Sequence, residues 1–401
     1  MKHILMVGRS REIFARSRGL DVRFSLILVG GASRTAEDLS GYQRVIVLPP
    51  DASVEEWLQC GQLINTFDPI DAIGGFTETA EKIAVDMAER LALPFHGRDV
   101  IHTTHDKFAM RERLRSLGID DTASRIVAAD DEASIREFAA EHGCPVVIKP
   151  LSARGSLGVS VVKSLEELPA ALAWFRAWAG GQPVLVEKFL AGEEWSVEAF
   201  SEGGVHRIMC ITRKFKSPQT CIETGHCLPA IFEEGARQRI HALVKSTLDA
   251  VGLQCGPSHT EVMMCAEGPR VIETHTRLGG DRIAEMIALL GGADPYQLWV
   301  RQVAGESVLP EVPVLDGSAF ASIQFTSPSC EGVLDRIEGL EQAISMPGVV
   351  RADAMVAPGQ RIGAVHDSFS RGASVLARAS TAEEAVLRAQ EAVAAINFIV
   401  S

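Results

Sequence analysis

Short apolar runs alternate with helical patterns along the first hundred residues, and this alternation constrains the fold more than any other feature of the sequence. Residues 4–7, 24–29, 45–48 and 72–73 have the composition of buried strands. Over residues 77–93, apolar side chains recur at helical spacing. Strands that alternate with helices predict a parallel sheet covered on both faces. We therefore expect the chain to begin with an α/β domain.

This first domain lacks the fingerprint of a dinucleotide-binding fold. Gly8 follows the first apolar run and Gly30-Gly31 follows the second, but no GxGxxG pattern follows the first. That pattern is what lets a strand-to-helix turn approach a pyrophosphate closely. Its absence disfavours a nicotinamide-dependent enzyme.

Length and charge exclude several further classes of protein. The 401 residues suffice for about two to four domains. The net charge of −13 opposes binding of a nucleic-acid backbone through bulk charge. No apolar run approaches the ~20 residues of a membrane span, and the start of the chain has no signal-peptide pattern. The eight cysteines form no CxxC pair, which is typical of reduced thiols. We expect a cytoplasmic protein that binds neither nucleic acid nor membrane.

A lysine ends the apolar strand at 146–150, and a glycine-rich loop follows it. Burial disfavours a charged lysine, so Lys149 would need an anionic partner. Gly155 and Gly158 permit close approach of the backbone, and exposed N–H groups with the Ser156 hydroxyl can bind phosphate oxygens. The order differs from the pattern GxxxxGK[ST], because here the lysine precedes the loop. A phosphate-binding loop and a plain hairpin turn with a solvent-directed lysine both agree with this segment.

Two glutamates are expected to face each other across a β-hairpin whose turn lies at 266–269. Because strand side chains alternate, Glu261 and Glu273 can project from the two arms onto one face, together with His275 and Arg277. Neighbouring carboxylates repel unless a cation or a proton lies between them. Mg²⁺ binds carboxylates together with substrate phosphates. A magnesium site is favoured over a solvated row of charges, because the sequence runs on into a turn and an apolar helix.

A smaller basic cluster lies at the end of another predicted strand. It consists of Arg213, Lys214 and Lys216. We interpret it as a solvated turn, with a position near phosphate groups as the alternative.

Taken in order, these segments resemble the ATP-grasp carboxylate–amine ligases. Nearly the whole chain takes part in the resemblance. Within the superfamily, Gly256–Glu261 and Glu273–Gly280 are most similar to the L-amino-acid ligases, which make dipeptides and related amides. The motifs that carry the resemblance are Asp106-Lys107, Lys149-Pro150, the glycine-rich loop, Glu187-Lys188-Phe189-Leu190, Glu194, Glu261 and Glu273-x-His275-x-Arg277.

The resemblance implies an α/β fold, α+β in part, of the ATP-grasp type. Residues 1–102 would form a Rossmann-like pre-ATP-grasp domain. The small, lid-bearing ATP-grasp subdomain would follow at 103–186, and the large subdomain with the metal and catalytic site at 187–305. Residues 306–401 would form a C-terminal domain similar to that of biotin carboxylase. A homodimer is the assembly usual for the family.

The resemblance also implies an ATP site. Two lysines would contact the phosphates, and the glycine-rich loop would close over them. The segment 187–190 would read the adenine through its backbone, and a glutamate would bind the ribose hydroxyls. In the order of these roles, the residues are Lys107, Lys149, Gly155, Ser156, Glu187, Lys188, Phe189, Leu190 and Glu194.

A metal and substrate site would adjoin the ATP site. Glu261 and Glu273 would hold Mg²⁺, with Mn²⁺ as an alternative. His275 stands where the family often has an asparagine ligand, and imidazole is a less usual partner for Mg²⁺. His275 is therefore expected either to bind the metal or to hydrogen-bond substrate or phosphate. Catalysis would depend on Arg277 and Lys149, and the residues around the substrate would be Glu223, His226, Arg277 and Gly280.

These assignments predict an ATP-dependent ligase for small molecules. It would activate a carboxylate, expected to be that of an amino acid, as an acyl phosphate and join it to an amine, with release of ADP and phosphate. One alternative is a purine-biosynthesis or biotin-carboxylase type of ATP-grasp enzyme, which the amino-acid-ligase character of residues 223–230 disfavours. The other is a nucleotide-binding protein without turnover, which the retained lysines, glutamates and Arg277 disfavour.

Overall fold

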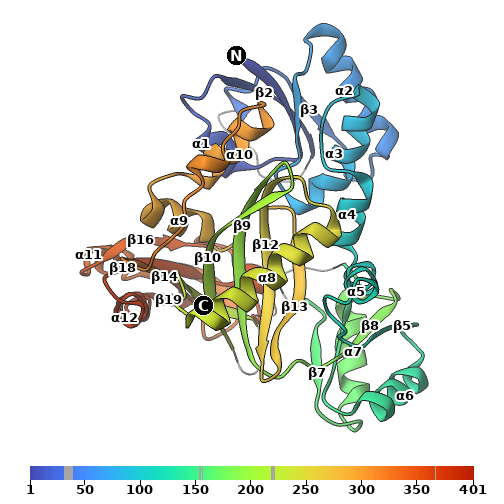
Figure 1. Cartoon of the computed structure of the whole chain (residues 1–401). Helices are drawn as coiled ribbons and strands as arrows, with labels where there is room; N and C mark the ends of the chain where they lie inside the picture. Colours follow the sequence, from blue (N-terminus) through green and yellow to red (C-terminus); the bar gives the residue numbers. More distant parts are fainter. Residues whose placement is uncertain (31–38, 153–154, 156, 218–221, 366) are drawn as a thin grey trace.

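The computed structural model describes residues 1–30, 39–152, 155, 157–217, 222–365 and 367–401 (Figure 1). Its N-terminal part has the expected alternation of strands and helices. Four parallel strands form a sheet in the order β3-β2-β1-β4. The predicted α/β domain is confirmed. Its elements are β1 (Lys2–Val7), α1 (Arg11–Arg16), β2 (Val22–Val29), β3 (Val45–Leu48), α2 (Val54–Phe67), β4 (Ala72–Gly74), α3 (Glu78–Leu91) and α4 (Arg98–His105).

Both faces of this sheet are covered, as the continuous apolar runs predict. Leu5 and Val7 of β1 lie in a core with side chains of α2 and α3. Ile4 and Met6 point to the other face, into a core that includes Trp299 of α10 (Pro295–Val303). Successive strand residues face opposite sides, so a strand that is buried on both sides has no polar alternation.

A second sheet, which is antiparallel, carries the glycine-rich loop. Its order is β5-β8-β6-β7, and β6 pairs with β7 across the loop. Helices α6 and α7 supply the core of this part. The domain boundary predicted after residue 186 falls inside β8. The elements are α5 (Lys107–Ser116), β5 (Ser124–Val127), α6 (Glu132–His142), β6 (Val146–Pro150), β7 (Ser160–Val162), α7 (Leu168–Ala179) and β8 (Val184–Lys188).

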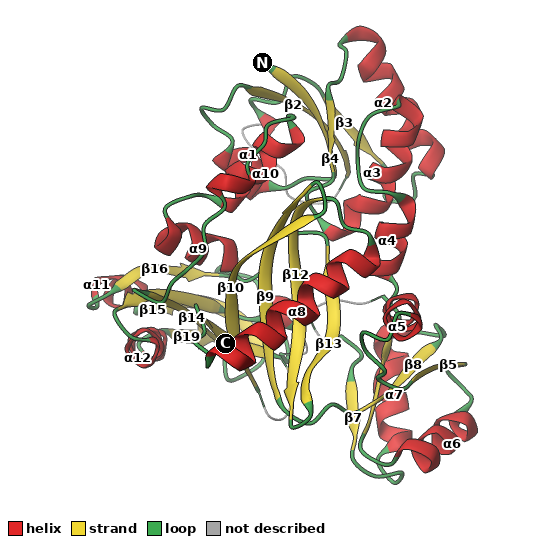
Figure 2. Cartoon of the chain, viewed as in Figure 1, coloured by secondary structure: helices red, strands yellow, loops and turns green. Residues whose placement is uncertain are grey.

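The largest sheet has eight strands in the order β13-β12-β9-β10-β11-β14-β18-β16. Helix α8 crosses one face of its first strands (Figures 1 and 2) and packs on Val197, Ala199 and Val262. The alternate residues of β9 therefore point to the other face. The elements are β9 (Glu193–Glu202), β10 (Val205–Lys216), β11 (Glu223–Leu228), α8 (Glu234–Val251), β12 (Cys255–Cys265), β13 (Gly268–His275), α9 (Ile283–Gly291), η2 (Leu309–Glu311), β14 (Phe320–Thr326), β16 (Val349–Ala354) and β18 (Ala373–Ala379).

Some of the C-terminal strands extend this sheet. Strand β14 pairs with β11, and β18 pairs with β14 and β16. Strands from before and after the boundary predicted at 305/306 therefore belong to one sheet. A small sheet, β17-β15-β19, completes the region. The remaining elements are β15 (Gly332–Glu338), α11 (Leu340–Ser345), β17 (Arg361–Ile362), η3 (Ser368–Ser370), α12 (Ala382–Ala394) and β19 (Asn397–Val400).

One hydrophobic core joins the N-terminal domain to the largest sheet. It contains Met6 of β1, Phe200 of β9, Leu228 of β11, Ile283 of α9 and Trp299 of α10. The ring of Trp299 also meets that of Phe76 edge-on, with 5.0 Å between the centroids. These apolar contacts fix the N-terminal domain relative to the strands that carry the candidate site.

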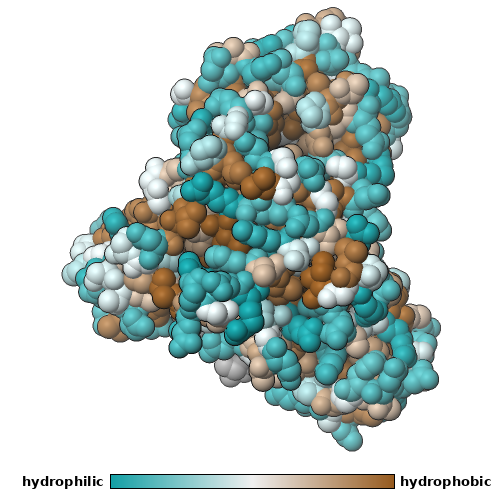
Figure 3. Space-filling view, viewed as in Figure 1, coloured by the Kyte–Doolittle hydropathy of each residue, from teal (hydrophilic) through white to brown (hydrophobic). Residues whose placement is uncertain are grey.

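The surface is mixed in character on the face that Figure 3 shows. Hydrophilic residues predominate along the edge formed by α2 and α3, and hydrophobic residues gather over α9. Within the described part of the chain, every helix is too short or too polar to cross a bilayer.

Phe200 tests the importance of the joining core, because its side chain is fully buried there. Phe200→Ala should lower the free energy of unfolding by roughly 3–5 kcal/mol, since it removes buried apolar area and leaves a cavity. Phe67→Ala is the matched control, because Phe67 is 71% exposed. It should change stability by no more than about 0.5 kcal/mol. Urea unfolding followed by circular dichroism measures both, and equal midpoints would contradict the assignment.

Candidate active site

A cavity of about 520 Å³ lies between the second sheet and the largest one. Strands β6 and β8 line it from one side and β9, β10, β12 and β13 from the other, with α5 between them. Most of the residues expected around ATP and metal meet here, while Ser156 lies outside the described residues. Those that line the cavity are Lys107, Lys149, Gly155, Glu187, Lys188, Phe189, Leu190, Glu194, Glu261 and Glu273. Glu223, which was expected around the substrate, lines it as well.

Lys149 has the buried anionic partner that its position in a strand requires. Its Nζ lies 2.7 Å from Oε2 of Glu187, and Nε of Arg111 donates to the other oxygen at 2.8 Å. Burial would raise the pKa of Glu187, but the charges of Arg111 and Lys149 outweigh it and lower that pKa to about 2. Burial lowers the pKa of Lys149. The backbone N–H of Lys188, expected near adenine, donates to the carbonyl of Ala123.

The two hairpin glutamates lie opposite each other, as the alternation predicts. Glu261 and Glu273 are direct partners in the antiparallel register of β12 and β13. Glu273 pairs with Lys107 at 2.8 Å and lies 3.0 Å from Nε2 of His275. Burial would raise the pKa of Glu273, but Lys107 and His275 hold it well below its usual range. His275 therefore contacts a predicted metal ligand directly.

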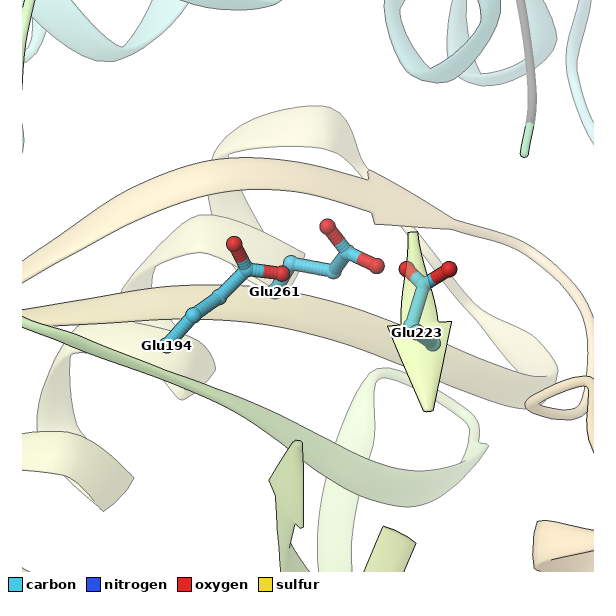
Figure 4. Close-up of side chains that lie close together, drawn as sticks. All are labelled: Glu194, Glu223 and Glu261. Carbon is cyan, nitrogen blue, oxygen red and sulfur yellow. The ribbon is translucent and has the colours of Figure 1, made fainter. Parts of the chain in front are cut away.

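Three glutamates from three strands surround one lysine. Figure 4 shows Glu194, Glu223 and Glu261 side by side, and one carboxylate oxygen from each lies within 4.8 Å of those from the other two. Lys214 pairs with Glu261, lies 2.6 Å from Glu194 and is 3.5 Å from Glu223. The interpretation of Lys214 as a solvated turn residue is wrong, because its side chain is 2% exposed. Strand β10 directs it onto the charged face of the sheet.

Oxygens of these three glutamates have the chemistry of ligands of a divalent cation, since Mg²⁺ prefers carboxylate oxygens. In this structure the ammonium group of Lys214 lies among them. Burial would lower the pKa of Lys214, but the three carboxylates raise it well above its usual value. The three carboxylates therefore stabilise positive charge at this place.

A histidine that was not predicted from the sequence to have a role lies beside Glu261. His259 is two residues before it on β12, so both side chains share a face. Its Nδ1 lies 2.9 Å from Glu198, and its Nε2 lies 3.6 Å from Glu261. Burial lowers the pKa of His259, but Glu198 raises it to about 9. His259 thus presents a positive charge to the glutamate.

Three of the residues expected around the substrate lie outside the lining of the cavity. The side chain of Arg277 turns to Glu78 in the N-terminal domain, with Nη2 and Oε2 2.9 Å apart. His226 is 3% exposed, and its Nε2 lies 2.9 Å from Asp281. Gly280 immediately precedes Asp281, which has a positive φ of 52°. Neither Glu78 nor Asp281 was predicted from the sequence to belong to the site.

The C-terminal region reaches the same site. Arg371 donates to both carboxylate oxygens of Asp281, at 2.8 and 2.5 Å, and Ser368 donates to Glu223 at 2.5 Å. A second cavity of about 280 Å³ adjoins Glu223, which lines both cavities, and Arg371 and Phe325 form part of its wall. Arg371 and Asp281 are 90 positions apart, and no sequence motif extends that far. Only the folded chain brings them together.

The glycine-rich loop meets this C-terminal segment. Gly155 has a φ of 66°, and a Cβ added there would lie 3.2 Å from the ring of Phe369. Phe369 is 69% exposed and belongs to η3, next to Ser368. The lid side of the cavity is thus bordered by the C-terminal region as well as by the second sheet.

Arg111 was not predicted from the sequence to belong to the site, although its spacing from Lys107 could have indicated it. It follows Lys107 by four residues in α5, and residues at that spacing share a helix face. Lys107 and Arg111 accordingly line the same cavity. Arg111 is 1% exposed and also donates to the carbonyls of Val271 and Ile272, which ties α5 to β13.

Comparisons with known proteins agree with this geometry. Residues 142–285 match the family model of the ATP-grasp domain, and residues 324–401 match that of the L-amino acid ligase C-terminal domain 2. The chain is 27% identical over 355 residues to the uncharacterized protein y4rH of Sinorhizobium fredii, which is 88% of this chain and 72% of that protein. It is 26% identical over 278 residues to the alanine–anticapsin ligase of Bacillus subtilis, spanning 62% of this chain and about half (56%) of the relative.

The fold comparison covers the whole chain. The crystal structure of an L-amino acid ligase from Bacillus licheniformis superimposes with a TM-score of 0.86 at 21% identity, over 100% of this chain and 99% of that one. At this identity the likeness concerns the fold. It includes the N-terminal domain and the C-terminal region together with the two sheets around the cavity.

Glu187→Gln should destabilise the protein and change its response to acid. The variant leaves two buried cations without a counter-charge, a loss of roughly 3–5 kcal/mol. The folded carboxyl has a pKa of about 2, below the roughly 4.3 of an unfolded glutamate. Its stabilisation is therefore complete above the unfolded pKa and disappears as pH falls toward 2.

Melting temperatures at pH 7 and pH 4 measure both effects. The variant should melt lower at pH 7, and its loss on acidification should be smaller than that of the wild type. Glu137→Gln is the control, because Glu137 forms an exposed pair with Arg125 and should change little. Wild-type melting in the Glu187 variant would show that the buried charges are compensated elsewhere.

Proposed function

The chain is an ATP-grasp protein of the carboxylate–amine ligase kind, with the C-terminal domain of the L-amino acid ligases, and from this premise we propose that it joins the carboxylate of an amino acid to an amine. The observation that carries the proposal is the set of alternating buried charges around one cavity. Lys107, Lys149 and Lys214 each lie against a carboxylate. Such pairs can exchange partners when phosphate oxygens enter.

The three lysines would bind the phosphates of ATP. Lys149 at the end of β6, Lys107 at the start of α5 and Lys214 on β10 all line the cavity. In a site shielded from water, fixed cations stabilise a developing negative charge more strongly than solvent does. Glu261 and Glu273 would hold Mg²⁺, which supplies further positive charge to the terminal phosphates. Their opposed register supports this role.

Activation at the terminal phosphate is the chemical path that these charges support. A carboxylate resists attack by amines because its leaving group is poor. Attack of the carboxylate oxygen on the γ-phosphorus breaks the bond to the β-phosphate oxygen and yields an acyl phosphate and ADP. The amine then attacks the acyl carbon, and inorganic phosphate leaves. Arg277 would hold the acid, and exclusion of water by the glycine-rich loop would protect the acyl phosphate.

Glu223 supports an amino acid as the substrate. It lines both the main cavity and the smaller one. An amino acid bound at Glu223 would place its reacting carboxylate in the main cavity and its side chain in the smaller one. Ile222, Phe325 and Val365 form the apolar part of the wall of the smaller cavity, whose other residues are polar. A carboxylate beside such a cavity suits a molecule with an ammonium group and a side chain. The purine-biosynthesis and biotin-carboxylase alternatives receive less support, because residues 324–401 match the L-amino acid ligases.

Glu273→Gln tests the metal assignment. It removes one charge while keeping the shape, so turnover should fall by about a hundredfold or more, with an unchanged circular dichroism spectrum. Glu267→Gln is the control, because Glu267 lies in the exposed turn of the same hairpin and should retain full activity. Phosphate release is the measurement, and wild-type turnover in the Glu273 variant would refute the assignment.

The products test the chemical path. A screen of amino-acid pairs with Mg-ATP should find pairs that release ADP and phosphate in equal amounts with an amide, which mass spectrometry identifies. Omission of either amino acid or of Mg²⁺ should abolish amide formation. AMP and pyrophosphate formed in step with the amide would contradict the acyl-phosphate path, and release of phosphate by no pair would contradict the substrate class.

A further inference from the structure

The end of strand β13 is held by one helix of the N-terminal domain. Glu78 and Glu81 occupy the first turn of α3, and side chains three residues apart share a helix face. Thr276 donates to Oε1 of Glu81 at 2.6 Å. Arg277, the next residue, donates to Oε2 of Glu78 through Nε at 3.1 Å and Nη2 at 2.9 Å. Consecutive residues after β13 are thus bound by two glutamates of one helix.

These bonds use only part of the donor capacity of Arg277. A guanidinium group has five N–H donors. One on Nε and one on Nη2 go to Glu78, and one on Nη1 goes to the carbonyl of Leu278. By this count, and among the described residues, one N–H on each Nη remains for a ligand. Two neighbouring guanidinium N–H groups bind a carboxylate in bidentate fashion.

The ion pair is sheltered and charged. The side chains of Glu78 and Arg277 are 17% and 22% exposed. Burial would raise the pKa of Glu78, but His275 and Arg277 outweigh it and lower that pKa, so Glu78 is a carboxylate at neutral pH. Its oxygen also lies 3.8 Å from Nδ1 of His275. The other nitrogen of His275 contacts Glu273, so Glu78 adjoins the predicted metal site as well.

Helix α3 is firmly placed, so it can act as a reference for the arginine. Ala80, Ala84 and Met87 bury one face of the helix against β1 and α2. The opposite face of the same sheet packs on Trp299 and Phe200 in the core that joins the domains. Glu81 is 1% exposed and lies 2.6 Å from Nε2 of His105. The helix therefore cannot shift relative to β13 without disrupting apolar cores on both sides.

We propose that Glu78 is the positioning residue for Arg277, and that the N-terminal domain thereby forms part of the acid-binding site. The inference rests on the proposed function, since it takes the substrate carboxylate as the ligand of Arg277. Glu78 occupies the Nε edge of the guanidinium and leaves one N–H on each Nη for the acid. Without this carboxylate, the arginine would be free to bind other acceptors and would lose its orientation. Misplacement of a binding group by about 1 Å can cost about a hundredfold in rate.

A double-mutant cycle tests the proposal with the amino-acid pair found by the screen. Glu78→Gln should lower kcat/KM for the acid about 10- to 100-fold, with the KM for ATP unchanged within about twofold. Arg277→Ala should lower it further. If Glu78 acts through Arg277, the double variant should be no worse than Arg277→Ala alone. Effects that multiply would overturn the proposal.

Controls separate positioning from a general loss of structure. Glu89→Gln changes another glutamate of α3, which pairs with Arg98 on the exposed side of the helix, and it should retain wild-type kcat/KM. All variants should melt within a few degrees of the wild type. If Glu78→Gln melts much lower, Glu78→Asp replaces it in the cycle, because it keeps the charge but is one methylene too short to hold both donors.

A crystal structure of the Glu78→Gln variant gives a readout that does not need activity. The guanidinium of Arg277 should leave the position that it has here. A guanidinium that keeps its position would overturn the inference even if the wild type is active. If the wild type releases no phosphate with any pair, the proposed function fails, and the position of Arg277 in the variant still decides whether Glu78 orients it.

Discussion

Buried charges in this protein are compensated by opposite charges from other elements, and the arrangement of the whole site depends on this pairing. An isolated buried carboxylate would cost several kcal/mol or would take up a proton. Glu187 on β8 is compensated by Lys149 on β6 and Arg111 on α5. Glu273 on β13 is compensated by Lys107 on α5. The second sheet, α5 and the largest sheet are thus joined through charges that none of them could bury alone.

The same pairing prepares the cavity for a charged ligand. Lys107, Lys149 and Lys214 are each oriented by a carboxylate, so little side-chain entropy remains to be lost when phosphates bind. The group of Glu194, Glu223 and Glu261 around Lys214 concentrates negative charge near a single cation. A divalent ion and a phosphate can enter such a site together, because the ion compensates the carboxylates and the phosphate compensates the lysine. Glu78 of the N-terminal domain and Arg277 after β13 likewise compensate each other's charges.

The backbone pattern of the protein could be predicted from the sequence to a large extent. Apolar runs at residues 4–7 and 24–29 correspond to β1 and β2, because a strand buried on both faces must be apolar throughout. The opposition of Glu261 and Glu273 followed from the alternation of side chains along the two arms of one hairpin. The division of the chain was harder to predict, since hydrogen bonds join β14 to β11 across the boundary predicted at 305/306.

The sequence by itself determined which residues were candidates for the site, because lysine after an apolar strand and paired glutamates on a hairpin are unusual enough to be informative. Only the tertiary structure decided which groups compensate one another. Lys214 belongs to an ordinary basic cluster in the sequence, and it is a buried central cation because β10 lies between β9 and β11. Glu78 and Arg277 are 199 residues apart, and Arg371 and Asp281 are 90 apart. Local patterns extend over one helix or one hairpin, whereas an ion pair depends only on distance in space, so such partners become visible only in the folded chain.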